Sequence, residues 1–160
     1  MKIGALKEIS LGEKRVALTP DSAIQLQKLG HDCLIESGSG MAAGFSDEQY
    51  KAAGVEISTN AEELTKTSDV IVKVLPPSEA EVKRFSSSKI LISFFYPGTN
   101  EALLEIAKSK DASVIAMDMV PRISRAQKMD ALSSMANISG YRAVIEAGNN
   151  FGRFFTGQMT

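Results

Sequence analysis

Residues 70–75 have the sequence Val-Ile-Val-Lys-Val-Leu, an apolar run that only Lys73 interrupts. A strand with one solvated face would alternate apolar and polar residues, so a run without alternation predicts a strand buried on both faces. Comparable short runs occupy residues 2–6, 33–36, 90–95 and 114–117. These candidate strands are of the kind that forms parallel sheets.

Helix-patterned segments separate the candidate strands, and they span residues 21–29, 47–53, 61–67, 79–85 and 100–108. Thr19 and Pro20 form a helix start, Ser46 with Gln49 is a potential capping box, and Asn100 is a potential N-cap. Strand and helix alternate along the chain. This order predicts an α/β fold with an open parallel sheet and helices on both faces, a three-layer flavodoxin-like or Rossmann-like lobe.

The pattern changes after the last candidate strand. Residues 121–130 carry three basic side chains without a strand pattern, which predicts an ordered loop. From Ser134 to about Phe155, apolar residues recur at helical spacing and predict one long helix. We therefore expect an amino-terminal lobe over residues 1–133 and a connecting helix over residues 134–160, which leads to a domain that this chain lacks.

Composition excludes several classes of protein. The chain has 160 residues, 18 basic and 19 acidic side chains and a net charge of -1, so it has no basic field for nucleic acid or an anionic membrane. No segment has the apolar length of a secretion signal or a membrane span. The single cysteine, Cys33, rules out an internal disulfide and a zinc site built from several cysteines.

A glycine-rich segment follows the candidate strand at residues 33–36. Gly38-Ser39-Gly40-Met41-Ala42-Ala43 satisfies the G-x-G-x-x-A pattern of dinucleotide-binding loops. In such loops the glycines run directly into a helix whose amides hold the pyrophosphate. Here Gly44-Phe45-Ser46 intervene, so the sequence favours a plain turn over a cofactor site.

Two cations stand where parallel sheets commonly bind ligands. Arg15 follows the first candidate strand, and Lys73 lies near the carboxyl end of the strand at residues 70–75. Together they could hold a carboxylate or a phosphate. Alternatively, both are solvated or paired with Glu8 or Asp118, and the spacing favours this second interpretation.

The loop after the last strand offers a guanidinium, an amide, a carboxylate and hydroxyls over residues 121–134. Such a set can hydrogen-bond a polar ligand such as a carboxamide and a ribose. The alternative is a helix-entry loop in which Asp130 and Ser133 act as caps. The residues alone leave these two interpretations equal.

Four of these motifs, in this order, resemble the amino-terminal family shared by alanine dehydrogenase and proton-translocating NAD(P) transhydrogenase. They are Arg-Val-Ala-Leu-Thr-Pro at 15–20, the glycine loop that leads to Asp47, Val-Lys-Val at 72–74, and Pro-Arg-Ile-Ser-Arg-Ala-Gln at 121–127. The sharper resemblance is to the NAD(H)-binding domain I of the transhydrogenase alpha subunit. Alanine dehydrogenase has a histidine acid/base after the fifth strand, and this chain has Tyr96 there.

The resemblance implies roles for six residues in binding NAD(H). Arg122, Ile123 and Ser124 are expected to approach the nicotinamide, and Gln127 is expected to contact ribose at the junction of the two nucleotides. Asp130 and Ser133 are expected to hydrogen-bond the carboxamide. Arg15 and Lys73 match substrate-carboxylate ligands of alanine dehydrogenase, and without the histidine they are expected to be structural. No catalytic side chain and no metal site is expected.

The resemblance further implies hydride transfer between NAD(H) on this domain and NADP(H) on a partner domain, coupled to proton translocation by a membrane domain. The expected partners are the missing Rossmann lobe, the membrane domain, the NADP(H)-binding domain and a second copy in a homodimer. The expected location is the cytoplasmic face of the inner membrane, or the matrix side in a mitochondrion. The isolated chain is expected to be inactive. The alternatives are a lobe of an alanine dehydrogenase-like enzyme and a free-standing binding module.

Overall fold

The computed structural model describes residues 1–153 and 155. They form two compact units, Met1–Met119 and a second unit that begins at Val120. This division differs from the boundary expected at residue 133, because the segment after Met119 is grouped with the long helix. The expected role of that helix as a connector stays a prediction.

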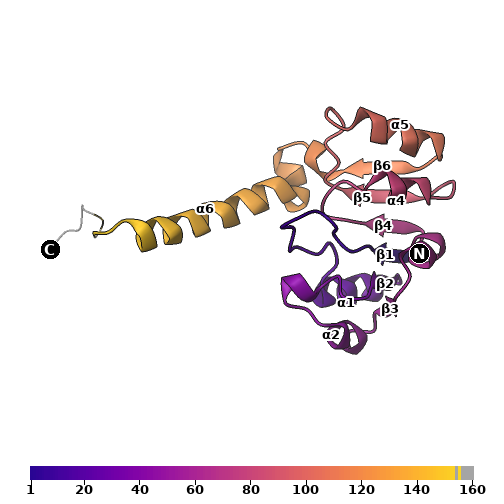
Figure 1. Cartoon of the computed structure of the whole chain (residues 1–160), viewed down its shortest axis with the longest axis horizontal. Helices are drawn as coiled ribbons and strands as arrows, with labels where there is room; N and C mark the ends of the chain where they lie inside the picture. Colours follow the sequence, from indigo (N-terminus) through magenta and orange to yellow (C-terminus); the bar gives the residue numbers. More distant parts are fainter. Residues whose placement is uncertain (154, 156–160) are drawn as a thin grey trace. The chain divides into compact units, whose positions relative to one another are not determined.

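A sheet of six parallel strands forms the first unit, in the order β3-β2-β1-β4-β5-β6 (Figure 1). The strands are β1 Lys2–Ala5, β2 Asp32–Glu36, β3 Glu56–Ser58, β4 Val70–Val72, β5 Ile90–Ser93 and β6 Ser113–Ala116. The α/β fold with a parallel sheet is thereby confirmed. This strand order is the Rossmann one, and it reverses between β1 and β4, where such sheets open a ligand crevice at their carboxyl ends.

β3 is the strand that the sequence did not predict. Ile57 is its single large apolar residue, and the strand pairs with β2 alone at the edge of the sheet. Such a short edge strand has no apolar run of its own. The other strands were predicted to within a few residues, although β4 and β5 end earlier than expected, at Val72 and Ser93.

Five helices connect the strands: α1 Pro20–Lys28, α2 Asp47–Ala52, α3 Ala61–Thr67, α4 Glu79–Lys83 and α5 Glu101–Ser109. The Ser46–Gln49 capping box is confirmed, and Thr19 forms a box of its own with Ser22. Asn100 is the N-cap residue of α5, as predicted, but its side chain accepts no hydrogen bond from the first turn of the helix. The side-chain amide donates to the Phe95 carbonyl oxygen at 2.8 Å.

Two apolar clusters lie on opposite faces of the sheet, because successive strand residues point to opposite sides. In β2, Leu34 joins the cluster under α3, α4 and α5, whereas Cys33 and Ile35 join the cluster under α1 and α2. The buried Tyr50 hydroxyl donates to the Leu18 carbonyl oxygen at 2.7 Å, and burial raises the pKa of this phenol to about 12. Helices therefore cover both faces, as the continuous runs predicted.

The coverage of β5 and β6 within the first unit is one-sided. Leu91 is buried, but Ile90 and Ile92 are only half-buried and Ile115 is exposed. The apolar runs at residues 90–95 and 114–117 predicted burial on both faces. Within the first unit, β5 and β6 are buried on one face only.

The second unit consists of a 3-10 helix, η3 Ser124–Met129, and the long helix α6 Ala131–Asn150 (Figure 1). The loop predicted at 121–130 is thus largely helical. α6 begins three residues before the predicted Ser134 and ends before Phe155, and residues 154 and 156–160 of the expected helix lie outside the described part. Ile138, Tyr141 and Val144 on α6 are exposed. Among the described helices, none is long and apolar enough to cross a membrane.

Gly4 allows α3 to pack closely on β1. A Cβ atom at Gly4 would lie 2.7 Å from Cδ2 of Leu64 and would also clash with Oγ of Ser68. We expect Gly4→Ala to lower the free energy of unfolding by about 1–3 kcal/mol, the usual cost of overpacking a core. Urea denaturation measures this change. Gly98→Ala is the matched control, because its Cβ would meet no atom within 4 Å; equal losses in both variants would contradict the packing argument.

Candidate functional site

All six residues predicted to bind nucleotide lie in the second unit, around the start of α6. They line one cavity of about 310 Å³, formed by Arg122, Ile123, Ser124, Gln127, Asp130 and Ser133. The compact turn of η3 brings them together: the Ala126 amide donates to the Ile123 carbonyl, and the Asp130 amide donates to the Gln127 carbonyl. A guanidinium, an amide, a carboxylate and hydroxyls therefore share one depression.

Asp130 is the organising residue of this cavity. Its carboxylate accepts the backbone N–H of Ser133 at 2.9 Å and the Ser133 hydroxyl at 2.5 Å, and so caps α6. These hydrogen bonds, with a smaller contribution from the charge of Arg122, hold the pKa of the Asp130 carboxyl below its ordinary range. The helix-capping interpretation of Asp130 and Ser133 is therefore realised, and the same two residues also line the cavity.

The glycine-rich loop binds a carboxylate from its own chain. Asp47 accepts the Ser37 hydroxyl at 2.7 Å and the Gly38 backbone N–H at 2.9 Å, and these hydrogen bonds lower the pKa of Asp47. A Cβ at Gly40 would lie 2.8 Å from the Phe45 carbonyl oxygen, so this glycine is needed for close packing. These contacts support the plain-turn interpretation over a phosphate site.

Lys73 is buried at the switch point and paired with acids. Its Nζ atom lies 3.1 Å from Oε1 of Glu81 and 3.7 Å from Oε2 of Glu8, and it donates to the Lys7 carbonyl oxygen at 3.1 Å. The Glu8 carboxylate in turn accepts the Val74 amide at 2.6 Å. The cluster joins the segments after β1 and β4 to α4, so the structural interpretation of Lys73 fits.

Arg15 is also paired, and its ion-pair partner is Glu13. Its Nε and Nη2 atoms donate to the carboxylate of Glu13 at 2.9 and 2.7 Å. This pairing raises the pKa of Arg15 and lowers that of Glu13. The Asp118 carboxylate, considered as a partner for the two cations, instead accepts the backbone amides of Phe95 and Tyr96 at 2.6 and 3.1 Å.

Tyr96 occupies a strained backbone position beside this carboxylate. Its φ angle is 50°, a left-handed conformation that residues other than glycine rarely adopt, and its ring stacks on that of Phe94 at 6.2 Å.

Metal binding has no support in the part of the chain that the structure describes, where no three His, Cys, Asp or Glu side chains are grouped as ligands.

The description "Alanine dehydrogenase/PNT, N-terminal domain" belongs to a family model that matches residues 4–139. The chain belongs to this family. It is 68% identical over its whole length to a protein named NAD(P) transhydrogenase subunit alpha from Cereibacter sphaeroides, of which it covers 31%. The resemblance found in the sequence is thereby confirmed, and the chain spans about a third of the length of this relative.

Solved structures show the same fold. A transhydrogenase from Sinorhizobium meliloti matches with a TM-score of 0.91 and 36% identity, over 100% of this chain and 48% of that one. An L-alanine dehydrogenase matches with a TM-score of 0.72 and 32% identity, over 75% of this chain and 33% of that one. Both are similar to this chain in fold and sequence, and the transhydrogenase matches it over a larger part.

We expect Lys73→Met to lower the free energy of unfolding by about 3–5 kcal/mol, since removing one partner leaves buried charge uncompensated. The carboxylates of Glu8 and Glu81 would lose their counter-ion in a site where these side chains are 4% and 11% exposed. Guanidinium denaturation measures the loss. Lys83→Met removes an exposed ion pair with Glu79 and should cost less than about 1 kcal/mol. A loss for Lys73→Met as small as that of the control would show that the cluster is not a stabilising element.

The lowered pKa of Asp130 predicts an acid-sensitive start of α6. Stability contributed by this carboxylate is complete above its ordinary pKa of 3.8 and is lost as pH falls through the lower folded-state value. The protection factor of the Ser133 amide, measured by hydrogen exchange, should fall in that window. Asp130→Asn keeps a capping oxygen without the charge, so protection in this variant should not change there. An identical acid loss in both proteins would contradict the assignment.

Proposed function

We propose that this chain is the first lobe of the NAD(H)-binding domain of an NAD(P) transhydrogenase and contacts the nicotinamide half of the nucleotide. The observation that carries the proposal is the cavity at the start of α6, which is lined by the six residues that the family resemblance assigned to the nucleotide. Its volume of about 310 Å³ is near the lower end of ligand pockets, which suits one end of a dinucleotide.

The donor and acceptor groups fit a nicotinamide riboside. The Asp130 carboxylate can accept an N–H of the carboxamide, and the Ser133 hydroxyl, which donates to Asp130, keeps lone pairs to accept a second hydrogen bond. Gln127 offers both a donor and an acceptor to a ribose hydroxyl. Arg122 supplies a positive charge at the edge of the same cavity.

The chemistry in this proposal is hydride transfer between NAD(H) and NADP(H), and it belongs to the nucleotides. The part of this chain is to hold one ring in a fixed position, so no side chain acts as an acid or base. Orientation of the carboxamide by Asp130 and Ser133 fixes which face of the ring is presented. This role needs a rigid support, and the capped first turn of α6 supplies one.

The rest of the enzyme lies outside this chain in the proposal. The chain covers 31% of its relative from Cereibacter sphaeroides. The proposed partners are a Rossmann lobe, a membrane domain that translocates protons and an NADP(H)-binding domain, whether these are fused to this chain or belong to separate chains. A homodimer on the cytoplasmic face of the inner membrane, or on the matrix side in a mitochondrion, belongs to the same proposal. The isolated chain lacks the adenosine contacts and is inactive.

An alanine dehydrogenase-like enzyme is the second candidate, and two observations disfavour it. Tyr96 stands where that enzyme's acid/base histidine is expected, so the imidazole that would shuttle the amination proton is missing. Lys73, the expected substrate ligand, is occupied by Glu8 and Glu81. The transhydrogenase proposal requires neither residue to be free.

Gln127→Ala in the complete enzyme tests the proposal. We expect hydride transfer to slow by about tenfold to a hundredfold through misplacement of the ring. NADH binding should weaken by about fivefold at most, the value of one neutral hydrogen bond. Single-turnover kinetics measures the transfer, and a fluorescence titration measures the binding. Gln25→Ala, on the exposed face of α1, is the control. An unchanged transfer rate in Gln127→Ala would refute the assigned role.

A further inference from the structure

One face of the sheet is only partly covered by the helices of the first unit. α1 and α2 lie against β2 and β3 on this face, whereas α3, α4 and α5 belong to the apolar cluster on the opposite face (Figure 1). The α1 side of β5 and β6 therefore has no helix of the first unit over it. We call this region the open face, and it consists of Val72, Ile90, Ile92 and Ile115.

Exposure rises from strand to strand along one row of side chains on the α1 side. The row crosses five strands through register partners, which point to the same side of the sheet: Ile35, Ala5, Val72, Ile92 and Ile115. Ile35 and Ala5 are fully buried. Val72 and Ile92 are half-buried, and Ile115 at the edge of the sheet is 48% exposed. The aliphatic row thus extends beyond the cover that α1 and α2 provide.

The open face has the composition of a buried surface. All-parallel sheets occur almost only with helices on both faces, and their strands are rich in Val and Ile for that reason. The strands β4, β5 and β6 contain no charged residue. Because the free energy gained on burial is proportional to the apolar area removed from water, this face favours an apolar partner.

The size of the open face suits one helix better than a second copy of the chain. A stable dimer interface takes about 20–30 residues from each partner. The open face has four aliphatic side chains on three short strands. The apolar stripe of a single amphipathic helix, with residues at i, i+3 or i+4 and i+7, covers an area of this kind.

The relatives contain further chain that could provide such a helix. This chain covers 31% of the alpha subunit from Cereibacter sphaeroides and 48% of the transhydrogenase chain from Sinorhizobium meliloti. A helix in the same polypeptide has a high effective concentration at the open face, because the linking chain keeps it close. It therefore needs a smaller contact area than a separate partner does.

We propose that the open face is the docking site of an amphipathic helix from the part of the full-length polypeptide that lies outside this chain. The aliphatic stripe of that helix packs on Ile92 and Ile115 and completes the second helical layer of the sheet. Docking depends on the sheet and on the length of the relatives, and not on nucleotide binding at the start of α6. The two proposals can therefore fail independently.

Ile115→Lys, made both in the full-length polypeptide and in this chain, tests the proposal through the hydrogen exchange of the amides of β6. In the full-length polypeptide the ammonium would be forced into an apolar contact, so exchange should become faster by about a hundredfold or more. In this chain the side chain is already 48% exposed, and exchange should change by about threefold at most. Ile115→Ala should show the same contrast, with an acceleration of about tenfold or more in the full-length polypeptide. This milder variant decides the matter if the lysine variant does not fold.

Leu104→Lys is the matched control, because Leu104 is an aliphatic residue on α5 that is 38% exposed. It should change exchange by about threefold at most in both proteins. Three results would each overturn the proposal. An acceleration no larger than that of the control in the full-length polypeptide would show that the open face is uncovered. An equal acceleration in this chain would mean that the chain covers the face itself. An acceleration in this chain that grows with protein concentration would identify a second copy as the partner.

Discussion

A buried ammonium at the switch point holds the first unit together. Nζ of Lys73 binds the Lys7 carbonyl and the carboxylates of Glu8 and Glu81, and thereby connects the segments after β1 and β4 to α4. A charge in this position must be fully compensated, because transfer of an ion from water costs several kcal/mol. The compensation fixes three chain segments at the place where strand order reverses. In open parallel sheets this place commonly binds ligands, and here the Lys73 ammonium is held by groups of its own chain.

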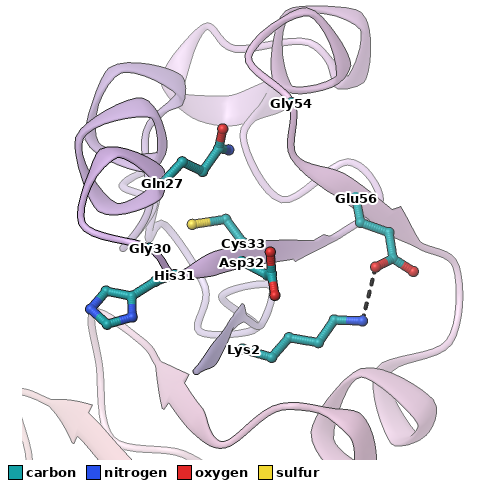
Figure 2. A pocket seen from close by; sticks show the side chains of 8 residues that line it. All are labelled: Lys2, Gln27, Gly30, His31, Asp32, Cys33, Gly54 and Glu56. Atoms are coloured by element: carbon teal, nitrogen blue, oxygen red, sulfur yellow. Dashed lines mark ion pairs between the residues drawn. The ribbon is translucent and has the colours of Figure 1, made fainter.

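The two edges of the sheet therefore differ in character. At the carboxyl edge, Lys73, Arg15 and Asp47 all have partners from their own chain. At the amino edge, the structure has a cavity of about 530 Å³, where the ammonium of Lys2 pairs with Glu56 (Figure 2). The six residues of the nucleotide proposal belong to the second unit, and the charge clusters described above belong to the first.

The sequence predicted the parallel sheet because burial on both faces removes the alternation of polar and apolar residues, as at residues 70–75. It missed β3, where Ile57 alone is apolar and pairing with β2 supplies the structure. It placed the N-cap of α5 correctly at Asn100, but residue type alone does not show that the side-chain amide donates to the Phe95 carbonyl and that the side-chain oxygen caps no amide. The family resemblance singled out the six residues that line the cavity at the start of α6, whereas the residues alone left a helix-entry loop equally open. The sequence did not predict the cavity at the amino edge of the sheet, because the residues that line it come from several elements and follow no motif.

The hydrogen bonds of Asp47 have a consequence for the evolution of this loop. A carboxylate tethered nine or ten residues away acts as an intramolecular ligand with an effective concentration of order millimolar. A phosphate in solution would have to compete with this built-in anion for the Gly38 amide. The glycine pattern alone is therefore not enough for nucleotide binding in this loop, since the Ser37 hydroxyl and the Gly38 amide already donate to Asp47. A segment can therefore match the dinucleotide-binding pattern without binding phosphate, because the Asp47 carboxylate already accepts the Gly38 amide.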